Sequence, residues 1–157
     1  MRQLVVHKCE GNSLLMWNNI RNPLRVTLNI FITEIAKYMP LGLKRSMYRA
    51  IGIKIGKDVA IGYKAQFDIL FPELIEIGEN TIIGYGATLL AHEFLTDEWR
   101  TGKIKIGKNV MIGANTTVLS GVSIGDNTVV SAMSLVNRDI PANVFAGGIP
   151  VRILKRK

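Results

Sequence analysis

The sequence is poor in the residues that cross-link chains and bind metals. It contains one cysteine, Cys9, and two histidines, His7 and His92. A single cysteine cannot form a disulfide within its own chain, so the fold is not a disulfide scaffold. A zinc site built from three histidines would need one more histidine than the chain contains. We therefore predict no metal site.

Long apolar runs and several familiar motifs are also missing. Residues 1–8 include no apolar stretch long enough for a signal peptide, and no uncharged run reaches transmembrane length. There is no nucleophile elbow and no P-loop, and Gly84-Tyr85-Gly86 lacks the third glycine of a dinucleotide fingerprint. The default expectation is a cytoplasmic protein.

Aromatic residues make up only 7% of the chain, although its net charge is +8. Residues 1–50 contain eight Lys and Arg against two acids, and residues 51–151 contain eight against ten. The last six residues add four bases. Because no basic stripe with interleaved aromatics occurs, we predict no nucleic-acid binding. Basic clusters at the two ends suit a phosphorylated ligand or an anionic membrane surface.

An apolar residue recurs every six positions between residues 104 and 136. The series is Ile106, Ile112, Val118, Ile124, Val130 and Val136, and a second series two residues earlier is Ile104, Val110, Thr116, Val122, Thr128 and Ser134. Turn formers such as Gly107-Lys108-Asn109 follow each pair, so each hexad reads as one short strand and one corner. A fixed period of this kind predicts a parallel β-helix.

The hexad phase can be traced back to Ile55, which places the solenoid at residues 51–151. Two insertions interrupt it. The spacing is ten between Phe67 and Ile77 and seventeen between Leu89 and Ile106. Insertions must leave a solenoid as loops because they have no neighbour on which to stack. We predict an extruded loop at about 93–103.

Residues 1–50 lack the hexad and are predicted to be helical. Asn22-Pro23 reads as an N-cap followed by proline at the first helical position. The expected apolar face is Leu24, Leu28, Phe31, Ile32, Ile35 and Met39; a second helix would bury Leu43, Met47 and Ile51, with Lys44, Arg45 and Arg49 on its other side. The segment either caps the open end of the solenoid or rests on a membrane surface, and we favour the cap.

Two groups of residues are candidates for chemistry. His92 lies where the chain leaves the solenoid, and imidazole is the usual general base near neutral pH, although a lone histidine can also be structural. Arg152 and Lys155 lie in the basic tail at 152–157, where they could bind phosphates or simply be solvated. Small residues in the late coils could form the floor of a groove for a thin ligand.

The chain resembles the hexapeptide-repeat acetyltransferases, most closely the maltose, galactoside and xenobiotic O-acetyltransferase branch. The resemblance covers about residues 51–155. It rests on the hexads, on His92, on residues 105–113, on Asn137-Arg138-Asp139-Ile140-Pro141 and on residues 146–152. It implies a left-handed parallel β-helix, a homotrimer and acetyl-CoA as co-substrate.

The resemblance also implies roles for individual residues. His92 would be the general base that takes the proton from an acceptor hydroxyl. The coenzyme contacts would be Gly113, Ala114, Ala132, Asn137, Arg138, Arg152 and Lys155, and the acceptor contacts Gln66, Asp68 and Glu93. Met133, Asn137 and Met111 depart from the residues that are usual in the family.

These observations lead to three hypotheses. The first is an acetyl-CoA-dependent O-acetyltransferase acting on a hydroxyl of a sugar or glycan-type acceptor. The second is the same chemistry on a lipid-linked or membrane acceptor, in which case the protein would be peripheral to the membrane through its N-terminal helices. The third is a non-catalytic β-helix scaffold, for which the bulky Met133 near the expected coenzyme path is the best support.

Overall fold

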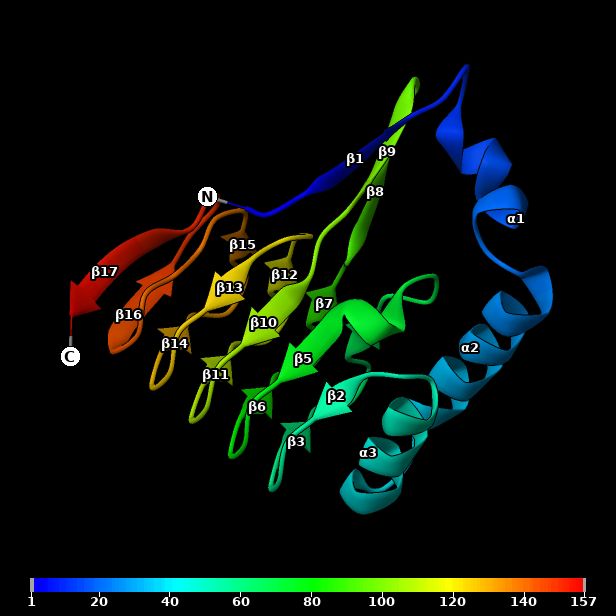
Figure 1. The fold of residues 1–157 in the computed structure, drawn as a ribbon. Coiled ribbons are helices and arrows are strands. Elements are labelled where there is room, and N and C mark those ends of the chain that lie inside the picture. The colour runs from blue at the N-terminus through cyan, green and yellow to red at the C-terminus, as the bar shows by residue number, and fades with distance from the viewer. Residues whose placement is uncertain (1, 157) are drawn as a thin grey trace.

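The computed structural model describes residues 2–156. From β2 onward the chain forms a β-solenoid whose coils stack in three parallel sheets (Figure 1). Sheet 1 contains β2 (Lys54–Ile55), β5 (Ile75–Ile77), β10 (Ile104–Ile106) and β13 (Ser123–Ile124). Sheet 2 contains β3 (Ala60–Ile61), β6 (Ile82–Ile83), β11 (Met111–Ile112), β14 (Val129–Val130), β16 (Val144–Gly147) and the antiparallel β17 (Arg152–Arg156). Sheet 3 contains β4 (Gln66–Phe67), β7 (Thr88–Leu89), β12 (Thr117–Val118) and β15 (Leu135–Val136).

The strand register follows the hexad of the sequence. Ile106 pairs with Ile124, three hexads later, so three strands and three corners make one coil. Phe67, Leu89, Val118 and Val136 stack in the same way along sheet 3 and are buried. The predicted parallel β-helix is therefore confirmed, with its core built from the inward series of apolar residues.

The corners between sheets 1 and 2 carry a column of asparagines. Asn80, Asn109, Asn127 and Asn143 all have left-handed backbone, with φ of 52°, 53°, 56° and 60°. Their amides form a ladder in which Nδ2 of one coil donates to Oδ1 of the next, at 2.8, 3.1 and 3.0 Å. Asparagine suits this position because it tolerates the left-handed region and can also bond to its neighbours.

Replacing Asn109 with alanine should lower the free energy of unfolding by about 2 kcal/mol, because left-handed backbone costs alanine about 1–2 kcal/mol and two ladder bonds are lost. Asn109→Gly removes the same bonds without the backbone cost, so its loss should be smaller. Urea unfolding of both variants measures the difference. Equal losses in the two variants would contradict this explanation of the corner.

The ends of the chain differ from the predicted helix, loop and tail. Val5–Lys8 is not helical but forms strand β1, which pairs antiparallel with β9 (Glu98–Thr101). β9 pairs in turn with β8 (His92–Phe94), so the expected loop at 93–103 is a β-hairpin. The basic tail continues sheet 2 as β17. In all three places backbone groups that were expected to be solvated or helical join a sheet.

Four helical elements lie between β1 and β2: η1 (Ser13–Met16), α1 (Trp17–Ile20), α2 (Pro23–Ala36) and α3 (Leu41–Ala50), and a short η2 (Pro72–Leu74) precedes β5. Asn22 caps α2 as predicted, since its Oδ1 accepts from the N–H groups of Leu24 and Arg25. The predicted buried face of α2 is only partly right, since Ile32 packs against the core and Ile35 and Met39 are half-buried. The side chains that pack inward are Val26, Asn29, Thr33 and Ala36, whereas Leu24, Leu28 and Phe31 are exposed. Within residues 2–156, no helix has the length and apolarity needed to cross a bilayer.

Helix α3 lies over the first coil, and Ile51 is buried and Met47 packs against the core, as predicted. Lys44 and Leu43 are reversed relative to the prediction. Lys44 is buried and donates to the carbonyls of Ile61 and Gly62, while Leu43 is exposed. Three further donors act on carbonyls of the same coil: Arg45 on Val59, Tyr48 on Ala65, and Arg49 on Ile55 and Gly56. The first coil has no preceding coil to satisfy these carbonyls, so polar side chains take that role.

Candidate active site

Two insertions bring Asp68 and His92 together at the corners that join sheet 3 to sheet 1. Asp68 follows the inward residue Phe67, and His92 begins the hairpin one coil later. Because Phe67 pairs with Leu89, the two side chains meet, and Nδ1 of His92 lies 2.5 Å from Oδ2 of Asp68. The histidine side chain is 16% exposed and that of Asp68 is fully buried.

Both carboxylate oxygens of Asp68 are occupied. Oδ1 accepts from the backbone N–H groups of Leu70 at 2.9 Å and Phe71 at 2.8 Å, and Oδ2 accepts from that of Ala91 at 2.7 Å. Burial alone would raise the pKa of Asp68, but the hydrogen bond and charge of His92, with those backbone donors, hold it below its ordinary value. The carboxylate is therefore ionised and can only accept hydrogen bonds.

An ionised Asp68 fixes the tautomer of His92. Since the carboxylate has no proton to give, Nδ1 of the imidazole must carry the proton that lies between the two groups. Neutral imidazole then has its lone pair on Nε2. This arrangement supplies a general base whose orientation is set by a buried hydrogen bond.

Aromatic side chains surround the imidazole. The ring centroid of Phe94 lies 4.8 Å from that of His92, and the centroid of Phe71 lies 5.9 Å from it. Trp99 stacks on Phe71 at 5.8 Å, and the guanidinium of Arg21 lies 4.2 Å from the centre of the Phe71 ring. The hairpin and the 68–71 loop thus give His92 an apolar wall. Nothing in the hexad pattern pointed to these aromatic neighbours.

The predicted acceptor contacts take three different positions. Gln66 is exposed on the outer face of sheet 3, close in sequence to Asp68. Asp68 has no free oxygen and no exposed surface, so it orients His92 rather than contacting an acceptor. Glu93 pairs with Arg2 and accepts from Oγ of Ser120 at 2.9 Å, which holds it away from the imidazole.

The predicted coenzyme contacts divide between two corners. Gly113, Ala114 and Ala132 lie between sheets 2 and 3, where a Cβ added to Gly113 would come within 2.3 Å of the Ala132 nitrogen. Met133 follows at φ of 58°, with its side chain 61% exposed. A side chain at position 113 would meet the backbone of the next coil, so glycine is required there.

Asn137 and Arg138 lie at the other corner, between sheets 3 and 1, in the same column as Asp68 and His92. Oδ1 of Asn137 is buried and has no hydrogen-bond partner in the described chain. Arg138 lines a cavity of about 210 Å³ together with Arg152 at the start of β17. Lys155 lies farther along β17, paired with Phe145. Their predicted contacts with a coenzyme stay predictions.

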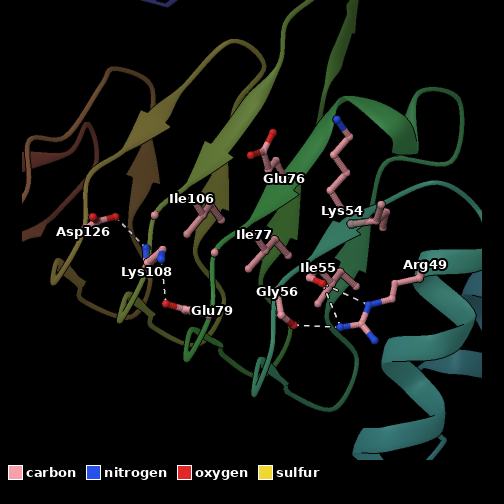
Figure 2. Close-up of a pocket in the computed structure, with 13 residues that line it drawn as sticks. Arg49, Lys54, Ile55, Gly56, Glu76, Ile77, Glu79, Ile106, Lys108 and Asp126 are labelled. Carbon is pink, nitrogen blue, oxygen red and sulfur yellow. Dashed lines mark hydrogen bonds and ion pairs between the residues drawn. The ribbon is translucent and has the colours of Figure 1, made fainter.

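A broader groove of about 710 Å³ runs across sheet 1 at the other side of the coils (Figure 2). Three of its acids are engaged, since Lys108 donates from Nζ to Glu79 at 2.8 Å and from its backbone N–H to Asp126 at 2.8 Å, and Glu76 pairs with Lys103. Arg49 donates to the carbonyls of Ile55 and Gly56 at its rim. Its lining residues include neither Asp68 nor His92, so we place the candidate site at the pair rather than in this groove.

Comparison with known proteins places the chain among relatives of one kind. Residues 103–138 match the family described as bacterial transferase hexapeptide (six repeats). The chain is 50% identical over 136 residues to the Bacillus subtilis (strain 168) protein named "Putative acetyltransferase YvoF", covering 85% of this chain and 79% of that one. It is 36% identical over 111 residues to galactoside O-acetyltransferase of Escherichia coli (strain K12), covering 64% and 55% of the two chains.

Solved structures show the same fold. A galactoside acetyltransferase in complex with coenzyme A superposes with a TM-score of 0.69 at 23% identity, over 85% of this chain and 81% of that one. A maltose O-acetyltransferase from Clostridium difficile 630 gives a TM-score of 0.65 at 22% identity, over 88% and 90%. An acetyltransferase from Vibrio cholerae complexed with acetyl coenzyme A gives 0.64 at 21% identity, over 85% and 86%.

Proposed function

Because the chain belongs to the hexapeptide-repeat acetyltransferases, we propose that it is an O-acetyltransferase that modifies a hydroxyl of a sugar or glycan-type acceptor, with His92 as the general base. The enzyme class and acetyl-CoA as co-substrate follow from its relatives. The galactoside and maltose enzymes among them support a sugar hydroxyl. The observation that carries the role of His92 is its contact with the buried Asp68 carboxylate.

The pair performs the proton transfer of the reaction. Nε2 of His92 takes the proton from the acceptor hydroxyl as its oxygen forms the new ester bond, and Asp68 stabilises the imidazolium that results. The imidazolium then gives the proton to the departing thiolate, so no net charge accumulates. The aromatic wall of Phe71, Phe94 and Trp99 keeps water from the imidazole and gives an apolar surface for a sugar ring.

The residues present fit acetyl-CoA, which supplies an acetyl group activated as a thioester. By the family resemblance, the strip of small residues Gly113, Ala114 and Ala132 would lie beside the narrow pantetheine arm. The unpartnered Oδ1 of Asn137 lies at the other corner, beside the Asp68–His92 pair, where in a trimer it would accept from an amide N–H of an arm that lies along the neighbouring copy. The exposed cations of Arg138, Arg152 and Lys155 complement phosphate groups.

A trimer of left-handed solenoids would bring the two groups of residues together. Within one chain, the strip beside Gly113 and the Asp68–His92 pair lie on different corners, separated by sheet 3. If neighbouring copies pack side by side, the strip of one copy can face the pair of the next. We infer on this ground, and from the family resemblance, a homotrimer whose sites each use two subunits.

The coenzyme part of the proposal is tested by calorimetric titration with acetyl-CoA. Arg152→Ala combined with Lys155→Ala should weaken binding by about tenfold to a hundredfold, because two charge-assisted contacts are lost. A matched control, Lys54→Ala with Lys57→Ala, removes the same charge at the other end of the solenoid and should bind as the intact chain does. Failure of the intact protein to bind acetyl-CoA would overturn the proposal.

A second candidate, the same chemistry on a lipid-linked or membrane acceptor, is favoured by one observation, the exposed apolar residues of α2. The third hypothesis, a scaffold without catalysis, is not supported, since the relatives are named as acetyltransferases and the Asp68–His92 pair is intact. A cytoplasmic location stays part of the proposal.

A further inference from the structure

Two side chains of the N-terminal segment bond to the loop that begins with Asp68. Asn29 is 2% exposed on the inner face of α2, and its Nδ2 donates to the carbonyl of Ile69 at 2.8 Å. Arg21 is the extended residue that ends α1, immediately before the N-cap of α2, and its Nε donates to the carbonyl of Leu70 at 2.7 Å. Burying a polar side chain costs free energy unless it is hydrogen-bonded, so these bonds account for the inward asparagine.

Each of these two carbonyls belongs to a peptide group whose N–H donates to Asp68. The carbonyl of Ile69 shares its peptide group with the N–H of Leu70, which donates to Oδ1 of Asp68 at 2.9 Å. The carbonyl of Leu70 shares its peptide group with the N–H of Phe71, which donates to the same oxygen at 2.8 Å. A peptide group is planar, so a bond that fixes its oxygen also fixes the direction of its N–H. Hydrogen bonds in a chain also polarise and strengthen one another.

Arg21 makes two further contacts with the same loop. Its guanidinium pairs with the carboxylate of Glu73 and lies 4.2 Å from the centre of the Phe71 ring. That ring is 8% exposed, and its centroid lies 5.9 Å from that of His92. The guanidinium therefore contacts both the backbone that bonds to Asp68 and the aromatic side chain that lies against the imidazole.

We propose that Arg21 and Asn29 are positioning residues of the Asp68–His92 pair. They hold the two peptide groups that fix Oδ1 of Asp68, and Oδ2 of the same carboxylate holds Nδ1 of His92. The N-terminal helices then support the active site as well as covering the end of the solenoid. The inference rests on the proposed function, since it assigns a role to residues behind the proposed base.

Arg21→Ala and Asn29→Ala should each lower kcat by about tenfold to a hundredfold, because a small displacement of a catalytic group has an effect of that size. The affinity for acetyl-CoA should be unchanged, since the residues proposed to hold it belong to the late coils and β17. Arg21→Lys keeps the positive charge but loses the planar fork, so it should recover only part of the lost turnover. Release of the coenzyme A thiol, beside calorimetric titration with acetyl-CoA, measures both quantities.

Arg49→Ala and Thr33→Ala are the matched controls. Arg49 also donates from the N-terminal helices to two backbone carbonyls, but these belong to the first strand of the solenoid. Thr33 lies one turn after Asn29, is 3% exposed, and has an Oγ1 without a hydrogen-bond partner in the described chain. Both controls should lose some stability and keep their turnover. If Arg21→Ala and Asn29→Ala also keep theirs, the proposal is wrong.

A double-mutant cycle with Asp68→Asn separates positioning from a purely structural role. In the Asp68→Asn enzyme the imidazole has already lost the arrangement that Arg21 supports. Adding Arg21→Ala should therefore lower kcat by no more than about threefold further, since two residues that act through one contact are not additive. An equal fall of kcat in both backgrounds would mean that Arg21 acts independently of Asp68, which would overturn the proposal.

NMR of the His92 imidazole gives a readout that does not depend on turnover. The Nδ1 proton should exchange with solvent at least about tenfold faster in Arg21→Ala and in Asn29→Ala, because its hydrogen bond to Asp68 opens more often. If Arg21→Ala does not fold, Arg21→Lys and Asn29→Ala carry the test. Exchange as slow as in the intact chain would contradict the positioning role. Faster exchange in these variants, with no turnover by the intact enzyme, would uphold the positioning and reject the proposed function.

Discussion

Replacing His92 with alanine should lower kcat about a thousandfold while leaving the affinity for acetyl-CoA unchanged. The imidazole is the group that takes the acceptor proton, and general base catalysis contributes roughly a hundredfold to ten-thousandfold. The coenzyme would be held by other residues, at the strip beside Gly113 and at the basic residues near β17. The substitution removes a largely buried partner of Asp68 and should cost some stability, but the three backbone donors to Asp68 remain, so the fold should be retained.

The measurement is release of the coenzyme A thiol with galactosides and maltose as acceptors, beside calorimetric titration with acetyl-CoA. The matched control is His7→Ala, which removes the other histidine of the chain. His7 lies in β1 and stacks on Trp99 of β9. The control should keep most of its turnover. Turnover of His92→Ala within a few-fold of the intact enzyme would assign the proton transfer to another group.

Asp68→Asn should lower kcat by about a hundredfold or more and also destabilise the fold. An amide NH₂ in the place of Oδ2 would face two donors, the N–H of Ala91 and Nδ1–H of His92. The imidazole escapes this clash by moving its proton to Nε2, which removes the lone pair that accepts the acceptor proton. The unsatisfied N–H of Ala91 should cost about 1–3 kcal/mol of folding free energy.

Acid titration separates the two effects of Asp68→Asn. The carboxyl pKa is lowered in the folded chain, so its contribution to stability is present above the ordinary carboxyl pKa near 4 and is lost as pH falls through the lowered value. The variant should lose less stability on acidification than the intact chain. Asp126→Asn is the matched control, since Asp126 also accepts a backbone N–H, that of Lys108, but lies away from His92. A stability loss in Asp68→Asn without a fall in kcat would reduce Asp68 to a structural role.

Much of the solenoid could be predicted because its signal is repeated. Each hexad places an inward apolar residue six positions after that of the preceding hexad. Because three hexads make one coil, the register of Ile106 on Ile124 follows from this spacing alone. The N-cap at Asn22 was predictable for a local reason, since its side chain bonds to groups two and three residues away. Handedness has no such signal, because strands and corners of either sense have the same period.

The inward side chains of the cap helices and the pairing of Asp68 with His92 were missed for a different reason. Amphipathic patterns assume that the inner face of a helix is apolar, but α3 covers a row of free carbonyls and therefore turns Lys44 inward. The Asp68–His92 contact spans an irregular coil. Aligning Phe67 with Leu89 before assigning roles would have placed the two residues at neighbouring corners.

The central claim is that a buried, ionised Asp68 holds His92 with its proton on Nδ1 and its lone pair on Nε2. Nitrogen-15 NMR of the imidazole tests this directly in the absence of any acceptor, with His7→Ala to assign the resonances. We expect the neutral ring to be the Nδ1–H tautomer in the intact protein and the Nε2–H tautomer in Asp68→Asn. An Nε2–H ring in the intact protein would leave no base facing the acceptor and would contradict the proposed catalytic role.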